Sequence, residues 1–332
     1  MSQMPNRGIP DGTLITRRDY LRAAGAGVLA MSGGPAPAAE TRPGSTLRDK
    51  ARRNLKPAVF TSVYGHLSLE EAARRIREDG FAGVCLDYRF ADVRFDPLEP
   101  DWDALRKIMG ALERNGLRVA GLWGYYNVID PDADRRRRGE RRMSTLIEHW
   151  RRFGTPVIST ETGTFNRENE FAEHPDNFTE AGYVAARAAF ERLARAAEKT
   201  GAIVAIEPYW RNVICSVDRA ERLFREVNSP SLRLTMDPCN YFRNEDLPRM
   251  RAMLEDIFRR VGDRTVLAHA KDVKATPTGQ DLPAAGLGQL DYATYLRLLA
   301  GLDRELFLVI EHLQLPDVPR ARDFVKAQIE RL

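Results

Sequence analysis

Four short apolar runs in the second half of the chain each end in a residue that can bind a metal ion. The residues are Glu207, Asp237, His269 and Glu311, in the sequences AIVAIEP, LRLTMDP, TVLAHAKD and ELFLVIEH. A parallel barrel presents its reactive groups at the carboxyl ends of its strands, so this pattern is typical of such a fold. Three carboxylates and one imidazole form an oxygen-rich ligand set, which suits Mn²⁺ or Mg²⁺ better than a structural zinc site.

The elements that must position these residues alternate along the chain after residue 55. Continuous apolar runs predict eight buried parallel strands. They are Ala58–Tyr64, Gly83–Asp87, Val119–Trp123, Val157–Thr160, Ile203–Glu207, Leu232–Asp237, Thr265–Ala270 and Leu306–Glu311. A helix is expected after each strand, capped at Ser68 in the first case and then over 101–115, 136–152, 179–199, 216–227, 247–261, 291–299 and 320–329. Eight such units predict an α/β fold, a (β/α)₈ TIM barrel that occupies residues 55–332 as a single domain.

Composition excludes several classes of protein. The 332 residues are 43% hydrophobic, which is enough for one large core. Fifty-one basic and 47 acidic residues leave a net charge of +4, which does not indicate a nucleic-acid partner. The three cysteines show no CxxC spacing, and a pairing of Cys215 with Cys239 is left open. The segment Gly286-Leu287-Gly288 lacks the context of a phosphate loop and predicts a turn that delivers Asp291 as a helix N-cap.

Residues 1–39 predict an export signal. A twin-arginine pattern at Thr16–Arg22 precedes a modest apolar stretch, Ala23–Met31, and an Ala36-Pro37-Ala38 cleavage site. This order favours a Tat signal, and hence a periplasmic or secreted protein, over a disordered basic N-terminus. The apolar stretch is too short to span a bilayer, and no membrane span is predicted elsewhere. Residues 40–54 are expected to form a polar linker.

The motifs IEP at 206–208, MDP at 236–238, HAKD at 269–272 and IEH at 310–312 resemble the xylose isomerase-like TIM barrel superfamily, the sugar phosphate isomerase/epimerase group. The resemblance extends over roughly residues 55–330. It implies one divalent cation, Mn²⁺ before Mg²⁺ or Co²⁺, with Glu207, Asp237, His269 and Glu311 as its ligands. It also implies that Glu207 and Glu311 act as the acid/base pair. Relatives often form dimers or tetramers, so a homo-oligomer is left open.

These residues suit proton transfer beside a carbonyl group. The transfer creates an enediolate, which a divalent cation stabilises as a Lewis acid while carboxylates remove and return the proton. The sequence therefore predicts a sugar isomerase or epimerase, and the export signal favours a free sugar, keto-sugar or related polyol as substrate. A lyase or dehydratase acting on an inosose or keto-glycoside would use the same site. A non-catalytic sugar-binding barrel is a further alternative, whereas a nuclease of this fold needs more metal-binding histidines.

Seven further residues are expected to bind substrate at the barrel mouth. Aromatic rings pack against sugar C–H faces, and amides and charged groups bind hydroxyls or an anionic group. The seven are His66, Tyr125, Glu161, Trp210, Arg211, Asn240 and Lys271. Asn240 stands where many relatives have a histidine, so the resemblance transfers the fold and the metal more directly than the reaction. The loop 166–177 and its neighbouring phenylalanines suggest a lid.

The strongest basic cluster of the chain is Arg135–Arg138 with Arg141 and Arg142. A solvated helix face is the simplest interpretation of such a run, and a docking patch for an anionic partner is the alternative.

Overall fold

Eight parallel strands form a closed barrel, as the sequence predicts. The computed structural model describes residues 46–277 and 279–332; the predicted signal peptide and the first residues of the predicted linker lie outside them. The barrel strands are β1 (Leu55–Phe60), β2 (Gly83–Leu86), β3 (Arg118–Trp123), β4 (Val157–Glu161), β5 (Ile203–Glu207), β6 (Leu232–Met236), β7 (Thr265–Ala270) and β10 (Leu306–Ile310). The barrel closes where β10 pairs in parallel with both β1 and β7.

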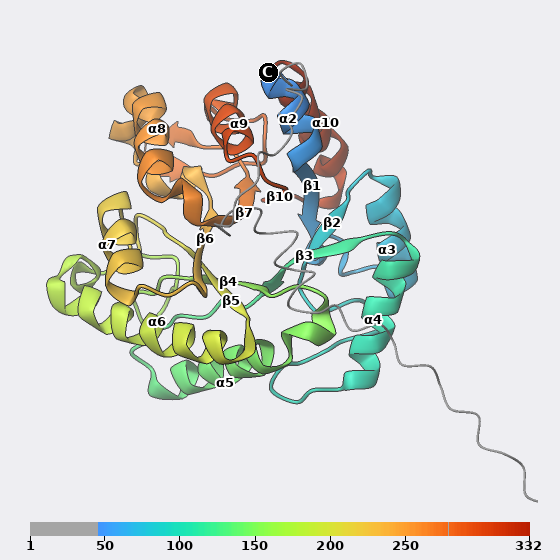
Figure 1. The fold of residues 1–332 in the computed structure, drawn as a ribbon, viewed down its shortest axis with the longest axis horizontal. Helices are drawn as coiled ribbons and strands as arrows, with labels where there is room; N and C mark the ends of the chain where they lie inside the picture. Colours follow the sequence, from blue (N-terminus) through green and yellow to red (C-terminus); the bar gives the residue numbers. More distant parts are fainter. Residues whose placement is uncertain (1–45, 278) are drawn as a thin grey trace, which may run out of the picture. The chain divides into compact units, whose positions relative to one another are not determined.

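Helices surround the strands on the outside of the barrel (Figure 1). They are α3 (Leu69–Glu78), α4 (Trp102–Arg114), α5 (Ala133–His149), α6 (Glu180–Thr200), α7 (Val217–Val227), α8 (Met250–Val261), α9 (Tyr292–Gly301) and α10 (Val318–Glu330). Capping residues set several of their starts. Ser68 and Glu71 form a capping box at α3, and Asp291 caps α9 as the Gly286–Gly288 turn predicts.

Some predicted boundaries shift for identifiable reasons. Strand β1 ends at Phe60, not at Tyr64, because residues Thr61–Tyr64 turn into a short 3-10 helix. The Thr61 hydroxyl bonds to the backbone of Asp87, which holds this turn against the end of β2. Helix α5 begins three residues before Arg136, because the Asp132 carboxylate caps it.

Part of the predicted linker is a helix. Residues 47–54 form α2 (Leu47–Asn54), which a capping box between Thr46 and Asp49 starts. Its polar sequence suggested a linker, but its charged side chains have distant partners. Lys50 and Arg53 pair with Asp303, at 3.2 and 3.6 Å, in the connection before β10. Another pair joins α2 to the end of α10.

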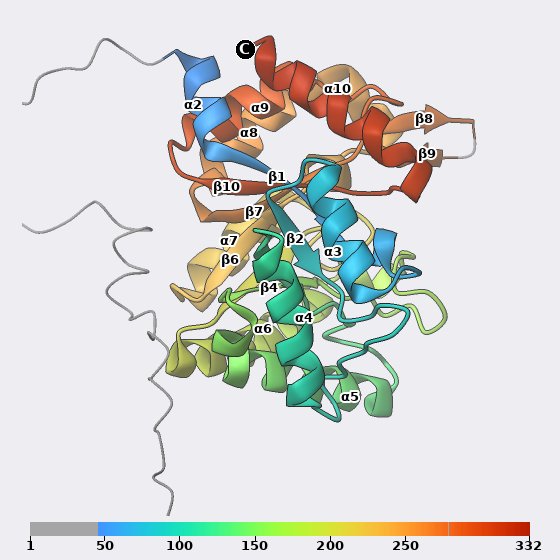
Figure 2. The same cartoon turned by 90° about the vertical axis from the view of Figure 1, so that its right-hand side faces the viewer.

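A small hairpin was not predicted. Strands β8 (Lys274–Thr276) and β9 (Gly279–Asp281) pair in antiparallel fashion within the long connection from β7 to α9. Figure 2 shows this hairpin and α2 on opposite sides of the barrel strands. The hairpin follows the carboxyl end of β7, whereas α2 leads into the amino end of β1. The chemistry-bearing strand ends therefore share the hairpin's end of the barrel.

The interior of the barrel is a separate apolar layer. It comprises Ala58, Phe60, Cys85, Ala120, Val157, Ala205, Leu267 and Val309, all buried. A second and larger cluster lies between the strands and the helices. All three cysteines are unpaired, so no Cys215–Cys239 disulfide forms in the structure. Among the described helices, none has the length and apolar character needed to cross a bilayer.

Candidate metal centre and active site

The period of two along a β-strand brings the four predicted ligands together. Ala205, Leu267 and Val309 belong to the barrel interior, and a ligand follows each of them two residues later. Glu207, His269 and Glu311 therefore continue the inward-facing rows of their strands. With Asp237 at the end of β6, they present ligand atoms that all lie within 4.8 Å of one another.

His269 lies at the centre of this group. Its Nδ1 atom is 3.3 Å from Glu311 Oε2, 3.4 Å from Glu207 Oε1 and 3.9 Å from Asp237 Oδ2. Both ring nitrogens are buried and have no hydrogen-bond partner among the described residues. Asp237 Oδ2 and Glu311 Oε1 likewise make no hydrogen bond there, although each forms an ion pair with Lys271. Orphaned buried donors and acceptors are costly, and these belong to types that bind hard divalent cations. The four residues thus fit a metal ion.

Lys271, which is predicted to bind substrate, lies inside the cluster and contacts two of the predicted ligands. Its buried ammonium group forms ion pairs with Asp237 and, at 2.8 Å, with Glu311 Oε1. Burial acts to raise the pKa of Asp237, but Lys271 and His269 together hold that pKa well below its usual value. Asp237 is therefore a permanent carboxylate, available as a ligand at any physiological pH.

Glu207 is held by two donors, which follow strands β6 and β3. Asn240 donates an amide hydrogen bond to Oε1 at 2.8 Å, and the Tyr125 hydroxyl donates to Oε2. Tyr125 also lies 3.0 Å from the Ser159 hydroxyl, which is 2.7 Å from that of Thr235. Ser159 and Thr235 are fully buried, so a chain of hydroxyl groups crosses the barrel interior beneath Glu207. Tyr125 and Asn240, which are predicted to bind substrate, both contact the predicted ligand Glu207.

Two tyrosines of α9 support the ligand strands from outside the barrel. The Tyr295 hydroxyl lies 2.8 Å from the carbonyl oxygen of His269 and 3.2 Å from that of Met236. Tyr292 donates to the carbonyl of Lys271 at 2.7 Å. These contacts fix the backbone of β6 and β7 where the ligands emerge.

Glu161 brings a further carboxyl group to the same end of the barrel. It pairs in register with Glu207 across β4 and β5. Burial raises the pKa of Glu161 well above its usual value, and the negative charges of Glu170 and Glu207 add to the effect. Glu161 is not among the four clustered ligands, and its role as a substrate contact stays a prediction.

Trp210 and Arg211 lie in the loop after β5, three and four residues after Glu207. The Trp210 backbone N–H donates to the carbonyl of Asn240 at 2.9 Å, and its indole N–H donates to Gln280 at 3.0 Å. Arg211 stacks on the Trp210 ring, as does Arg243 from the connection after β6. The sequence analysis missed Gln280 and Arg243, because nothing in their local sequence marks them.

Among the predicted site residues, His66 lies away from the ligand cluster. It is exposed after the 3-10 turn that follows β1, and no contact in the described chain joins it to the ligand cluster.

The predicted lid is fastened to the barrel. Asn177 is fully buried, and its side chain bonds to the backbone of Phe165 and to the carbonyl of Arg211. Arg219 of α7 donates to the carbonyls of Asn177, Val213, Phe178 and Thr179. Phe171 and Phe178 remain exposed.

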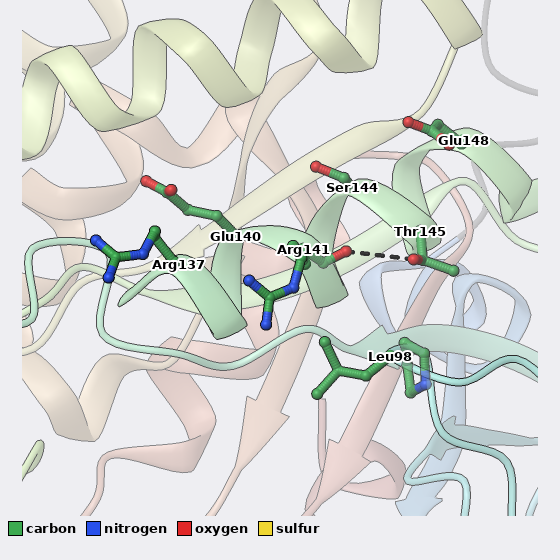
Figure 3. Close-up of a pocket in the computed structure, with 8 residues that line it drawn as sticks. Leu98, Arg137, Glu140, Arg141, Ser144, Thr145 and Glu148 are labelled. Carbon is green, nitrogen blue, oxygen red and sulfur yellow. Dashed lines mark hydrogen bonds between the residues drawn. The ribbon is translucent and has the colours of Figure 1, made fainter. Parts of the chain in front are cut away.

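The basic cluster lies on α5, and its first three arginines have local partners. Arg135 pairs with Asp130 at 2.8 Å, and Arg137 pairs with Asp134 one turn away. A groove of about 430 Å³ runs between α5 and the β2–α4 connection (Figure 3), and its lining includes none of the metal-type ligands. The local pairs support the interpretation of a solvated helix face.

Comparison with known proteins agrees with this architecture. The model of the xylose isomerase-like TIM barrel family matches residues 73–328. No curated protein matches the sequence. Three similar solved structures are 15–18% identical to this chain, and at this identity the likeness shows a shared fold alone.

One of them is the 3-keto-D-glucoside 4-epimerase of E. coli, which is 18% identical, covers 82% of this chain and 100% of its own, and gives a TM-score of 0.62. A probable 3-DHS dehydratase of Bacillus anthracis is 16% identical over 83% of this chain and 97% of its own, with a TM-score of 0.61. A xylose isomerase-like TIM barrel protein of Mycobacterium smegmatis in complex with magnesium is 15% identical over 85% and 98%, with a TM-score of 0.62. The family match covers most of the barrel, and the chain therefore belongs to the xylose isomerase-like TIM barrel family.

Proposed function

We propose that this protein is a divalent-metal-dependent sugar isomerase or epimerase that acts on a free sugar, keto-sugar or related polyol. The observation that carries the proposal is the buried cluster of Glu207, Asp237, His269 and Glu311, whose ligand atoms lie within 4.8 Å of one another and whose histidine nitrogens make no hydrogen bond among the described residues. The oxygen-rich set favours Mn²⁺, with Mg²⁺ or Co²⁺ as alternatives. Structures of similar fold include a keto-glucoside epimerase and a protein in complex with magnesium.

The residues of the chain divide the work of proton transfer. Glu207 and Glu311 come from β5 and from the end of β10, so they approach a bound substrate from different sides of the mouth. In an epimerase, one removes the proton beside the carbonyl group and the other returns it on the opposite face, whereas an isomerase would use one of the two carboxylates. Asn240 and Tyr125 keep the Glu207 carboxylate in one orientation, and the Lys271 ammonium group lies against Glu311. When bound, the cation supplies Lewis-acid stabilisation of negative charge on the substrate oxygens.

Deuterium exchange tests the proposal. Protein loaded with Mn²⁺ is incubated in D₂O with a panel of ketoses and keto-glycosides, and exchange at carbon is followed by NMR. We expect exchange with at least one member, and Glu207→Gln and Glu311→Gln should each slow it by about 10²–10⁴-fold, which is typical of a lost general acid or base. Glu148→Gln, an exposed change on α5, is the matched control. No exchange with any member, or full exchange in both variants, contradicts the proposal.

The same site supports a second reaction, elimination of water or an aglycone beside a carbonyl group. Asn240 favours this option, because its amide cannot titrate near neutral pH as the histidine of many relatives does. One structure of similar fold is described as a probable dehydratase. Mass spectrometry of the products separates the two reactions, since isomerisation conserves mass and elimination does not.

A further inference from the structure

Two arginine side chains stack on one tryptophan at the rim of the barrel mouth. The guanidinium carbon of Arg211 lies 4.5 Å from the centroid of the Trp210 ring, and that of Arg243 lies 5.0 Å from the same centroid. Arg211 comes from the loop after β5, and Arg243 from the connection after β6. Stacking on an aromatic face holds a guanidinium group in a fixed plane while leaving its edge N–H groups able to donate.

The platform beneath the two arginines is rigid. The Trp210 indole donates to Gln280 at 3.0 Å, and the Gln280 amide donates to the carbonyl of Phe242 at 2.6 Å. The carbonyl of Arg211 accepts a hydrogen bond of 2.7 Å from Asn177. Four connections, those after β4, β5, β6 and β7, therefore meet at Trp210 and Arg211. A binding group held this way loses little conformational freedom when a ligand arrives.

The charges of Arg211 and Arg243 are uncompensated. About half of the described arginines have carboxylate partners, as Arg249 does with Asp246 at 2.8 Å. Across residues 46–277 and 279–332, neither Arg211 nor Arg243 forms an ion pair, although both are half-buried. The Nε of Arg211 is a buried donor without any hydrogen-bond partner. Such a donor indicates a missing acceptor.

This pair lies next to the metal-type ligands. The carbonyl of Asn240 accepts from the Trp210 backbone, while the Asn240 side chain donates to Glu207. Tyr209 also links the two regions. Burial raises its pKa, and the positive charges of Arg211 and Lys271 both act to lower it, so both cations are within electrostatic reach of one hydroxyl group.

The charge balance of the mouth leaves these arginines in excess. The three carboxylates of Glu207, Asp237 and Glu311 balance the Lys271 ammonium group together with one divalent cation. These groups then sum to zero charge, Glu161 adds one carboxyl group beside Glu207, and Arg211 and Arg243 add two positive charges at the rim. A neutral sugar would leave both unpaired, whereas a planar guanidinium fork matches carboxylate and phosphate oxygens.

We propose that the substrate carries an anionic group, a carboxylate or a phosphate ester, and that Arg211 and Arg243 bind it away from the reacting carbon. This inference rests on the proposed sugar isomerase or epimerase function and narrows its substrates to acidic sugars. The two sources of negative charge are distinguished by experiment.

The test measures binding and not turnover. Mn²⁺-loaded protein is titrated by calorimetry with a panel of hexuronates, a panel of hexose 6-phosphates and the parent neutral hexoses, at constant ionic strength. We expect members of one anionic panel to bind at least about tenfold more tightly than their neutral parents, because charge-assisted hydrogen bonds are stronger than neutral ones. The panel that binds identifies carboxylate or phosphate.

Variants assign the effect to the pair. Arg211→Met and Arg243→Met keep an apolar stem on Trp210 and remove the charge, so each should weaken binding of the anionic ligand by about 10- to 100-fold without affecting binding of neutral hexoses. Arg249→Met is the matched control, and the thermal unfolding midpoint shows that each variant is folded. Equal binding of acidic and neutral sugars, binding of no acidic sugar, or unchanged binding in both variants overturns the inference. Arginine-dependent binding without deuterium exchange would instead keep the anion site and reject the isomerase function.

Discussion

At the scale of single residues, the orientation of Glu207 is the most closely determined feature of the site. Its two oxygens have different donors, the amide of Asn240 and the hydroxyl of Tyr125. Burial and the negative charge of Glu207 raise the pKa of Tyr125 well above its usual value, so its hydroxyl group stays protonated and donates. A carboxylate that must accept a proton at one defined position benefits from such a fixed arrangement.

Tyr125→Phe should therefore reduce kcat by about 10- to 100-fold while leaving KM nearly unchanged, because the lost hydrogen bond positions the base and does not bind substrate. Steady-state kinetics with the substrate identified by the exchange panel checks this. Tyr126→Phe alters a neighbouring tyrosine whose hydroxyl makes no hydrogen bond in the described chain, and it serves as the control. A Tyr125→Phe enzyme with wild-type kcat would show that Glu207 does not need this donor.

At the scale of elements, the connection after β4 behaves as a fastened segment and not as a free lid. Four backbone carbonyls of this connection and the next one converge on the guanidinium group of Arg219. Backbone acceptors that lose a shared donor must find water, and a loop that loses such a donor opens more often.

Arg219→Met should accelerate amide hydrogen exchange across residues 163–179 while the barrel strands keep their protection. The thermal unfolding midpoint should fall by several degrees, since each lost hydrogen bond contributes about 1 kcal/mol. Arg225→Met, an exposed change on the same helix, is the control. If amide exchange across residues 163–179 is equally fast in Arg219→Met, Arg225→Met and the unaltered protein, then Arg219 does not restrain the loop.

The elements also show what a sequence can and cannot reveal. The strands and the ligands Glu207, Asp237, His269 and Glu311 were predictable, because a buried strand is an apolar run and its end is marked by a single polar residue. Helix α2 was not, because its charged face depends on Asp303 and α10, which are distant in sequence. The hydroxyl chain from Tyr125 was also hidden, although Thr235 is a polar residue at an inward-facing position and could have suggested it.

At the scale of the whole molecule, stability and chemistry occupy opposite ends of the barrel. Helix α2 packs where the strands begin, and every predicted ligand lies where they end. Outside the barrel, adjacent helices are joined by ion pairs. Glu226 of α7 is a junction of this kind, since it contacts Arg222 and reaches Arg187 and Tyr183 of α6.

Acid should weaken the junction between α6 and α7. Hydrogen bonds from Arg222, then from Tyr183 and Arg187, lower the pKa of Glu226 from 4.5 to about 2. Because the folded-state pKa lies below the unfolded one, the stabilisation is complete above pH 4.5 and is lost as the pH falls toward 2. Glu226→Gln should therefore lower the thermal midpoint at pH 7 and have little effect near pH 2. A difference in thermal midpoint between Glu226→Gln and the unaltered protein that is the same at pH 7 and near pH 2 would contradict this.

The aromatic rings beneath the site give the molecule an optical property. Trp123 lies 4.4 Å from Tyr125, measured between ring centroids, and 5.5 Å from Phe60, whose ring lies 5.6 Å from that of His269. An indole so close to the groups that hold a cation senses changes in their electric field. We therefore expect the fluorescence emission of Trp123 to change when the centre is occupied, without an added dye or a coupled assay.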